Sequence, residues 1–352
     1  MSKFWSPDVR ELTPYVPGEQ PRERLIKLNT NENPYPPAPG VEQVLRDYPV
    51  DHLRLYPDPD ALALREALAH EHGVAVEQVF VGNGSDEVLA LAFQTFFRQP
   101  RPLLMPGITY SFYPVYCRLY DIAYRTVALD DHWQVPLDAL TGDNGGVIFA
   151  NPNAPTGHGH PREAIARLLD RVTDSVVLVD EAYVDFGGES CVPLVADYPN
   201  LLVVGTFSKS RSLAGLRIGY AIGSRELIEG LERVKNSFNS YPLDSLAIAA
   251  GVAALADREH FDACREHVIA TRERTRRRLV ALGFEVLPSQ TNFLLARHDG
   301  HDAGALFTGL RERGILVRHF NSEALHDFLR ISIGTDDEMD SLIEALEALC
   351  RG

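Results

Sequence analysis

Between residues 60 and 207 the chain repeats one pattern, and this repeat limits its fold more than any other feature. Short apolar runs such as QVFVG, GVIFA and SVVLVD alternate with longer segments whose apolar residues recur at helical spacing. Strands that are apolar on both faces must be covered on both faces. The pattern therefore predicts an α/β fold, with a mostly parallel central sheet flanked by helices. The predicted strands are 78–82, 102–106, 124–129, 146–150, 175–180 and 201–207, and the predicted helices are 60–73, 85–97, 110–120 and 161–172.

The pattern changes near residue 240, which predicts a second, smaller α/β domain. Two long helices are predicted first, at 244–257 and 260–283. Three strands then alternate with two helices: strands 292–297, 315–320 and 328–333, and helices 303–313 and 336–350. A chain of 352 residues is long enough for two domains. We expect an N-terminal arm that also forms part of the small domain (1–29), a large domain (30–240) and a small C-terminal domain (241–352).

Polar groups follow four of the predicted strands. These groups are the segments GNGSDE, NPNAPTG, DEAY and TFSK, each placed directly after an apolar run. In open parallel sheets, ligands bind beyond the carboxyl ends of the strands. We therefore expect the four segments to meet in one crevice.

Three of these segments suit a phosphorylated ligand with an aldehyde and a basic ring. GNGSDE runs into a helix, whose N-terminal N–H groups suit a phosphate, although an ordinary capped turn would look the same. Asp180 ends a buried strand, so its carboxylate needs a cationic partner or a helix to cap. Lys209 ends another buried strand, where a lysine forms a Schiff base or pairs with an acid. Together with Arg217 as an anion ligand, these groups meet the requirements of pyridoxal 5′-phosphate (PLP).

The segment SKSRSLAGLRIG resembles the lysine signature of fold type I PLP-dependent aminotransferases of class I/II, and the resemblance runs over nearly the whole chain. Within that group the chain is most similar to the histidinol-phosphate aminotransferase family. The segments that carry this likeness include LTPYVPG, KLNTNENPYPP, RLYPDP, VFVGNGSDEVLALAF, VDEAYVDF and RVKNSFNSYPLDSLA. The resemblance implies transamination of histidinol phosphate with 2-oxoglutarate, which yields imidazole-acetol phosphate and glutamate in histidine biosynthesis.

The resemblance also implies a role for individual residues. Lys209 would form the Schiff base and move the proton, Asp180 would keep the pyridine nitrogen protonated, and Tyr183 would hydrogen-bond the ring hydroxyl. Tyr110 would stack on the ring, and Tyr56 would reach the cofactor phosphate of a neighbouring subunit, which implies a homodimer with shared sites. The other implied cofactor contacts are Gly84, Ser85, Asp86, Asn153, Ser208 and Arg217. The implied substrate contacts are Tyr15, Glu32, Asn33, Arg318 and Arg330, of which Tyr15 and the two arginines would hold the substrate anion.

One position departs from the pattern of this family. The family has an asparagine immediately before Pro-Thr-Gly, and this asparagine donates to the ring oxygen. Here Ala154 occupies that position in NPNAPTG, so either Asn153 or Asn151 replaces it or the contact is missing. We assign the contact to Asn153.

Related activities stay open at this point. An aromatic amino-acid aminotransferase would use the same catalytic groups with a different pocket. A threonine-phosphate decarboxylase would share the fold and the phosphate-binding arginines. A PLP-binding regulator without turnover would need a DNA-binding segment, and no basic extension is present in this sequence.

The composition limits the partners and the compartment. A net charge of −15 argues against nonspecific binding to nucleic acid or to an anionic membrane. The four cysteines lie far apart without zinc spacing, and the histidines at 70, 72, 158 and 160 have no acidic or cysteine partner in a metal pattern, so we expect no bound metal. Together with the lack of an apolar signal segment or a membrane span of ~18 residues, these features predict a cytoplasmic enzyme.

Overall fold

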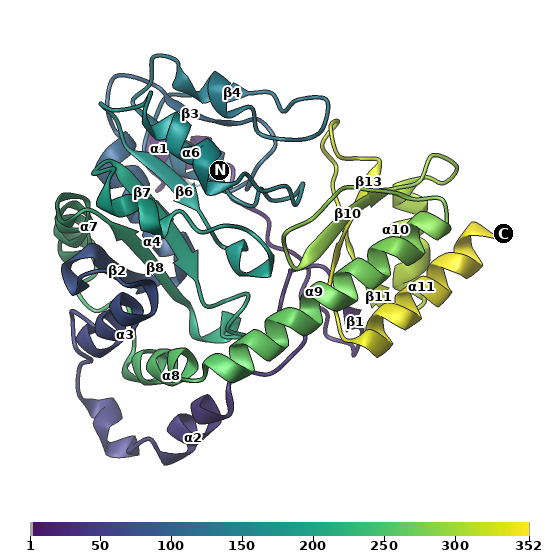
Figure 1. Cartoon of the computed structure of the whole chain (residues 1–352), viewed down its shortest axis with the longest axis horizontal. Helices are drawn as coiled ribbons and strands as arrows, with labels where there is room; N and C mark the ends of the chain where they lie inside the picture. Colours follow the sequence, from purple (N-terminus) through teal and green to yellow (C-terminus); the bar gives the residue numbers. More distant parts are fainter. Residues whose placement is uncertain (1–2, 352) are drawn as a thin grey trace.

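A computed structural model of the chain describes residues 3–351. In Figure 1 the large sheet and the helices around it lie on the left, and a smaller α/β unit lies on the right. The long helix α9 (Arg258–Ala281) runs from one to the other. The predicted fold class is confirmed, because a mostly parallel central sheet is flanked by helices and accompanied by a smaller α/β unit.

The large sheet has seven strands in the order β2-β8-β7-β6-β5-β3-β4. All neighbouring strands are parallel except at β8, which runs antiparallel to both β2 and β7. The first six predicted strands are all present, whereas β8 was not predicted. The strands are β2 (Val79–Asn83), β3 (Leu103–Pro106), β4 (Tyr124–Val127), β5 (Gly146–Ala150), β6 (Val177–Asp180), β7 (Leu201–Thr206) and β8 (Ile218–Gly223).

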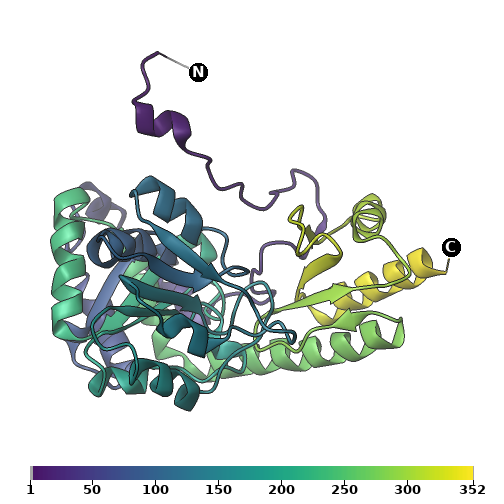
Figure 2. The ribbon, with the colours of Figure 1, turned by 90° about the horizontal axis from the view of Figure 1, so that it is seen from above.

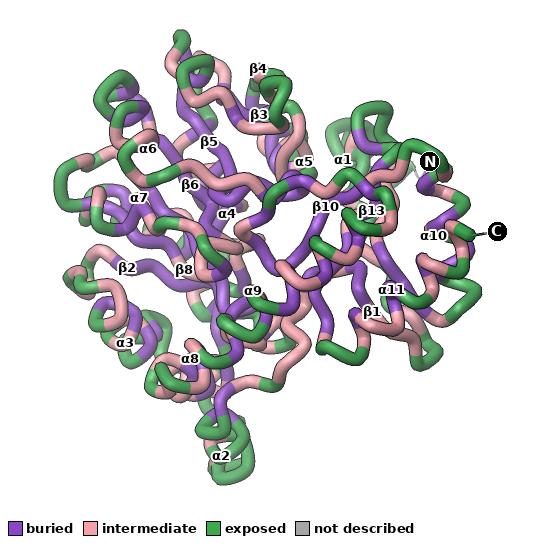
Figure 3. Tube along the Cα trace, turned by 45° about the vertical axis from the view of Figure 1, so that its right-hand side comes forward, coloured by how far each residue is buried: buried purple, intermediate pink, exposed green. Residues whose placement is uncertain are grey.

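Apolar side chains pack against both faces of this sheet. In β6, Leu178 points to the core that contains helices α4, α5 and α7, whereas Val177 and Val179 point to the core that contains α6. Figure 3 shows β5 and β6 buried along their length, as strands covered on both faces must be. The covering helices are α4 (Gly84–Ala92), α5 (Tyr113–Leu119), α6 (Arg162–Leu169) and α7 (Arg225–Phe238).

A third apolar cluster lies beside β2 and β8. It joins α2 (Pro39–Asp47), α3 (Leu62–His72) and α8 (Ser245–Ala256), with Val41, Leu64 and Ala250 at its centre. Helix α8 therefore packs on the large sheet, although it follows residue 240. The division of the chain into domains at residues 29 and 240 stays a prediction.

The smaller unit is built from both ends of the chain. Its antiparallel sheet has the order β12-β13-β10-β9, and strand β1 pairs in parallel with β11 in a separate two-stranded sheet. Leu28, directly after β1, is buried in the same core as Leu294, Ile331 and Leu342. The elements are β1 (Ile26–Lys27), β9 (Glu285–Val286), β10 (Phe293–Arg297), β11 (Ile315–Leu316), β12 (Arg318–His319), β13 (Phe328–Ser332), α10 (Ala303–Glu312) and α11 (Asp336–Cys350).

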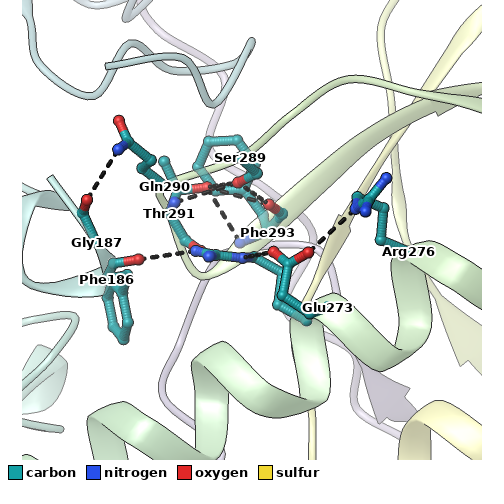
Figure 4. Close-up of polar contacts among 9 residues, drawn as sticks. Phe186, Gly187, Glu273, Arg276, Ser289, Gln290, Thr291 and Phe293 are labelled. Carbon is teal, nitrogen blue, oxygen red and sulfur yellow. Dashed lines mark hydrogen bonds and ion pairs between the residues drawn. The ribbon is translucent and has the colours of Figure 1, made fainter. Parts of the chain in front are cut away.

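A buried arginine on α9 joins the two units. Arg272 donates from Nη1 to the carbonyl of Phe186, in the large unit, and to the carbonyl of Thr291, in the small unit, both at 2.8 Å. Figure 4 shows this junction, with Phe186 and Gly187 on one side and the segment from Ser289 to Phe293 on the other. Burial lowers the pKa of the Arg272 guanidinium, so the two carbonyl contacts and the neighbouring Glu273 are what keep this charge in place.

The short helix α1 (Pro7–Glu11), near the start of the N-terminal arm, lies apart from both sheets, as Figure 2 shows. The helices between residues 3 and 351 were searched for candidate membrane spans, and all of them are too short or too polar to cross a bilayer.

Candidate active site

A cavity of about 360 Å³ opens at the carboxyl ends of the central strands. All four strand-end segments that were predicted to converge contribute to its wall, so that convergence is confirmed. The lining residues also include three from the N-terminal segment. The wall consists of Gln20, Thr30, Glu32, Ser85, Asp86, Tyr110, Ala150, Ala154, Asp180, Ala182, Tyr183, Thr206, Ser208, Lys209, Ala214, Gly215 and Arg217.

Lys209 follows β7 and projects its amine into the cavity. Its Nζ donates to the carbonyl of Thr30 at 3.3 Å and lies 5.6 Å from the centre of the Tyr183 ring. Between residues 3 and 351, no carboxylate forms an ion pair with this amine. The amine is therefore available for a ligand rather than committed to a structural ion pair.

Asp180 ends β6 and is buried. Tyr113 donates its hydroxyl proton to Asp180 Oδ2 at 2.7 Å, and the N–H of Ala182 donates to Oδ1 at 3.1 Å. Burial raises the pKa of the Asp180 carboxyl to about 6, although these two hydrogen bonds act in the opposite direction. A protonated ring nitrogen beside this carboxyl would stabilise the negatively charged form of Asp180, so the two groups would bind each other strongly.

Tyr113 was missed in the sequence, where it looks like an ordinary core aromatic of a short helix. It is fully buried, and burial raises the pKa of its phenol well above the ordinary value, so the phenol stays protonated and donates. A buried tyrosine needs a partner for its hydroxyl. That requirement is a signal, but the sequence does not show which partner it has.

The N-terminus of α4 lies at one end of the cavity, where Ser85 and Asp86 line its wall. The side chain of Asn83 does not cap this helix, which leaves the N–H groups of the first turn free. Gly84 has a φ of +78°, and a Cβ at this position would lie 2.4 Å from Nη2 of Arg217. A Cβ on Gly219 would meet the backbone of Gly84 and Ser85 at 2.2–2.3 Å. The two glycines thus allow the guanidinium and strand β8 to approach the helix terminus closely.

Arg217 and Tyr110 both contact Asp86 at this end. Arg217 Nη2 lies 2.9 Å from Oδ2 of Asp86, and the hydroxyl of Tyr110 donates to Oδ1 at 3.0 Å. Ser208 lines the same wall, and its hydroxyl accepts from Thr206 at 3.0 Å, so the Ser208 proton remains to be donated. The structure thus brings together Gly84, Ser85, Asp86, Tyr110, Ser208 and Arg217.

Asn153 does not line the cavity. Its amide donates to the carbonyl of Ile108 at 3.0 Å and to the hydroxyl of Thr156 at 3.1 Å, while its Oδ1 is buried without a hydrogen-bond partner within residues 3–351. Asn151 also uses its amide, on the carbonyl of His160. The expected contact of Asn153 with a ring hydroxyl stays a prediction, and this geometry does not support it. Ala154 lines the cavity instead.

Two arginines lie next to each other on the small unit. Arg318 and Arg330 are directly opposite in the β12–β13 pair, where like charges repel. In the described part of the chain neither forms an ion pair with a carboxylate, and Arg330 Nε is buried without a hydrogen-bond partner. Burial lowers the pKa of the Arg330 guanidinium, and the nearby hydroxyls of Tyr183 and Tyr15 oppose this shift. Two adjacent guanidinium groups without a carboxylate partner are suited to an anionic ligand.

The remaining predicted residues lie in different surroundings. Glu32 lines the cavity and pairs with Lys27 at 2.6 Å, whereas Asn33 donates to the carbonyls of Lys209 and Ser210 and so holds the backbone of the lysine. Tyr15 packs on Phe112 with 4.8 Å between ring centres. Tyr56 is outside the cavity, is 83% exposed and stacks on Tyr241.

Outside the cavity, three side chains lie close enough together to hold a metal ion. The ligand atoms of His298, His301 and Cys350 lie within 4.8 Å of one another. Both ring nitrogens of His298 are already within hydrogen-bond distance of backbone groups, at Leu282 and Gly300. The absence of a bound metal stays a prediction.

The family model "Aminotransferase class I and II" matches residues 23–346. The histidinol-phosphate aminotransferase of Chromohalobacter salexigens is 80% identical over 351 residues, with 100% of both chains covered. Histidinol-phosphate aminotransferase 1 of Methylococcus capsulatus is 57% identical, covering 100% of this chain and 99% of the relative. The crystal structure of the Sinorhizobium meliloti histidinol-phosphate aminotransferase in complex with PLP has a TM-score of 0.90 at 26% identity, over 100% of this chain and 98% of that chain.

The fold and the cavity are therefore those of a PLP-dependent transferase, and the chain belongs to the class I and II aminotransferases. Within that family it is similar over its full length to histidinol-phosphate aminotransferases.

Proposed function

We propose that this chain is a PLP-dependent enzyme that transfers the amino group of histidinol phosphate to 2-oxoglutarate, in histidine biosynthesis. The observation that carries the proposal is the position of the Lys209 amine. It faces the cavity without an ion-pair partner in the described part of the chain, and the buried carboxyl of Asp180 lines the same cavity. The full-length likeness to histidinol-phosphate aminotransferases supports the choice of substrate.

The side chains around the cavity fit PLP. The uncapped N-terminus of α4, with Ser85, Ser208 and Arg217, offers N–H, O–H and guanidinium donors for the phosphate. Asp180 offers a carboxylate for the ring nitrogen, and Tyr110 offers an aromatic face in the wall between them. Gly84 and Asp86 belong to the same helix terminus.

Bound PLP supplies an aldehyde for the amino group and a ring that accepts electrons from the substrate carbon. The Lys209 amine holds and returns the proton of that carbon, acting as a general base and then as a general acid. The Asp180 carboxylate, oriented by Tyr113, holds a proton on the ring nitrogen. Tyr183, which also lines the cavity, donates a hydrogen bond to the ring hydroxyl oxygen.

Arg318 and Arg330, with the hydroxyl of Tyr15, bind the anionic end of each substrate. The phosphate of histidinol phosphate and the distal carboxylate of 2-oxoglutarate are both anions, so one pair of arginines serves both. Glu32 and Asn33 would line the substrate entrance. A contact of Asn153 with the ring oxygen would require its amide to leave the carbonyl of Ile108 or the hydroxyl of Thr156.

A substrate panel on the PLP-loaded enzyme tests this function. Histidinol phosphate should exceed both histidinol and phenylalanine in kcat/KM by at least about 10²-fold, because charge-assisted hydrogen bonds to the phosphate contribute a few kcal/mol. Arg318→Gln should remove most of this advantage, whereas Arg313→Gln, at the C-cap of helix α10, should retain it. Preference for phenylalanine would point to an aromatic aminotransferase, and carbon dioxide release from threonine phosphate would point to a decarboxylase.

We further propose a homodimer in which Tyr56 reaches the cofactor phosphate of the neighbouring subunit. Apolar side chains around Tyr56 are exposed, including Leu53, Leu55 and Tyr241, and such a patch is typical of an interface. Light scattering should give twice the mass of one chain, and the double substitution Leu53→Glu and Leu55→Glu should shift the enzyme to monomers with lower activity. A wild-type monomer with full activity would exclude the shared site.

We also propose that the enzyme acts in the cytoplasm. The cysteines Cys117, Cys191, Cys264 and Cys350 are all unpaired, as is usual in a reducing compartment.

A further inference from the structure

Asn31 is a buried polar residue whose polar groups are all engaged. It is 2% exposed and has a left-handed φ of +56°, which asparagine tolerates better than most residues. Its Nδ2 donates to the hydroxyl oxygen of Tyr183 at 2.9 Å, and its carbonyl accepts from Asn292 at 2.9 Å. Its Oδ1 accepts from the hydroxyl of Ser332 at 2.9 Å. The sequence indicated no role for this residue.

The network around Ser332 determines which way the Asn31 amide points. The hydroxyl oxygen of Ser332 accepts from the backbone N–H of Asn31 at 2.8 Å, so its own proton must be donated elsewhere. Oδ1 of Asn31 accepts the hydrogen bond from this hydroxyl, and Nδ2 is therefore the atom that faces Tyr183. The reversed amide would leave the buried Ser332 proton without an acceptor, which is unfavourable.

This direction has a consequence for Tyr183. Because the phenol oxygen accepts a hydrogen bond from Asn31, the phenol O–H is free to donate to an acceptor in the cavity that Tyr183 lines. A hydrogen bond accepted by a hydroxyl also strengthens the bond that it donates.

The rest of Tyr183 is held independently of Asn31. Its ring packs edge-on against Phe293 at 5.2 Å, and its carbonyl accepts from the N–H of Phe186. Arg272 links Phe186 to Thr291, the residue before Asn292. Figure 4 labels Phe186 and Thr291 on the two sides of this link. Removing the Asn31 side chain therefore leaves the tyrosine in place and changes mainly its hydrogen bonding.

The side chains at positions 153 and 154 provide no second donor of this kind. The amide hydrogens of Asn153 are donated to Ile108 and Thr156, and position 154 carries only a methyl group. We propose that Asn31 is a positioning residue that makes Tyr183 the hydrogen-bond donor to the ring oxygen of PLP. This inference rests on the proposed function.

The test is the pH dependence of the visible absorbance of the PLP-loaded enzyme. A hydrogen bond donated to the ring oxygen stabilises negative charge there and so lowers the proton affinity of the neighbouring nitrogen that joins the cofactor to Lys209. In Asn31→Gly, which keeps the left-handed backbone, the midpoint of the absorbance change should rise by about one pH unit. In a Tyr183→Phe background the same substitution should add no further shift.

The matched control is Asn29→Ala. Asn29 is equally buried on the same segment, but its amide donates to the carbonyl of Glu19 rather than to Tyr183. The midpoint of the absorbance change in Asn29→Ala should match that of the parent enzyme. Lys209 and Arg330, which both interact with Tyr183, are unchanged in every variant.

Two outcomes would overturn the inference: an unchanged midpoint in Asn31→Gly, or an equal shift that persists in the Tyr183→Phe background. A parent enzyme that shows no visible absorbance after loading with PLP would instead overturn the proposed function on which the inference rests.

Discussion

Lys209→Ala should reduce turnover of histidinol phosphate by on the order of 10⁴-fold or more, because the substitution removes the only group in the mechanism that moves the proton. The loss should lie in kcat rather than in KM, since the phosphate-binding groups are untouched. Single-turnover measurements on the PLP-loaded variant check this. Added methylamine should restore part of the rate, because a small amine can fill the space left by the side chain and act as the base.

The fold should survive this substitution. The Lys209 side chain makes a single hydrogen bond, to the carbonyl of Thr30, and no ion pair within residues 3–351. The free energy of unfolding of the cofactor-free variant should therefore match that of the parent within about 1 kcal/mol. If a variant whose substitution has been verified retained turnover, Lys209 would not be the residue that moves the proton.

Asp180→Asn should have two opposite effects. Turnover should fall by on the order of 10²–10³-fold, because the ring nitrogen loses its charged partner. The cofactor-free protein, however, should become more stable above pH 6. Because burial raises the pKa of this carboxyl from 3.8 to about 6, the folded state binds the proton more tightly than the unfolded state. Stability from this group is thus full below about pH 4 and is lost as the pH rises to about 6, a loss of about 3 kcal/mol.

The neighbouring carboxyl provides the matched control. Burial also raises the pKa of Glu181, to about 7, but this carboxylate accepts from the N–H of Cys191 and does not line the cavity. Glu181→Gln should therefore stabilise the protein at high pH and leave turnover within a few-fold. Tyr113→Phe should lie between the two in turnover. Urea unfolding from pH 4 to 8 measures the stabilities, and equal pH profiles for Asp180→Asn and the parent would contradict the assignment.

Much of the fold was predictable because parallel strands buried on both faces leave a strong apolar pattern. Strand β8 was not predicted: IGYAIG contains two glycines, and the strand begins directly after the left-handed Arg217. Helix α2 was also missed, since Val41 is its only buried residue. The predicted helix 85–97 ends as α4 at Ala92 and continues as a π-helical turn to Phe97.

The strand-end residues of the site were predictable for the same reason. Ser85, Asp180 and Lys209 each lie at or just after the carboxyl end of a strand, and these ends lie on the same side of the sheet. Tyr113 and Asn31 were not, because their partners are far away in the sequence and arise only through packing. A contact between Asn31 and Tyr183 depends on the N-terminal segment crossing to the small unit, and no local pattern records that crossing.

The pairing of β1 with β11 also constrains how the chain is made. Ile26 pairs with Ile315, so β1 must wait until all the residues between it and β11 have been synthesised. At a synthesis rate of ~5–20 residues per second this delay is about 15 to 60 s. The large unit can form its sheet during that time, whereas the smaller unit, and with it the network that orients Asn31 toward Tyr183, is completed only after β11 and β13 have been synthesised.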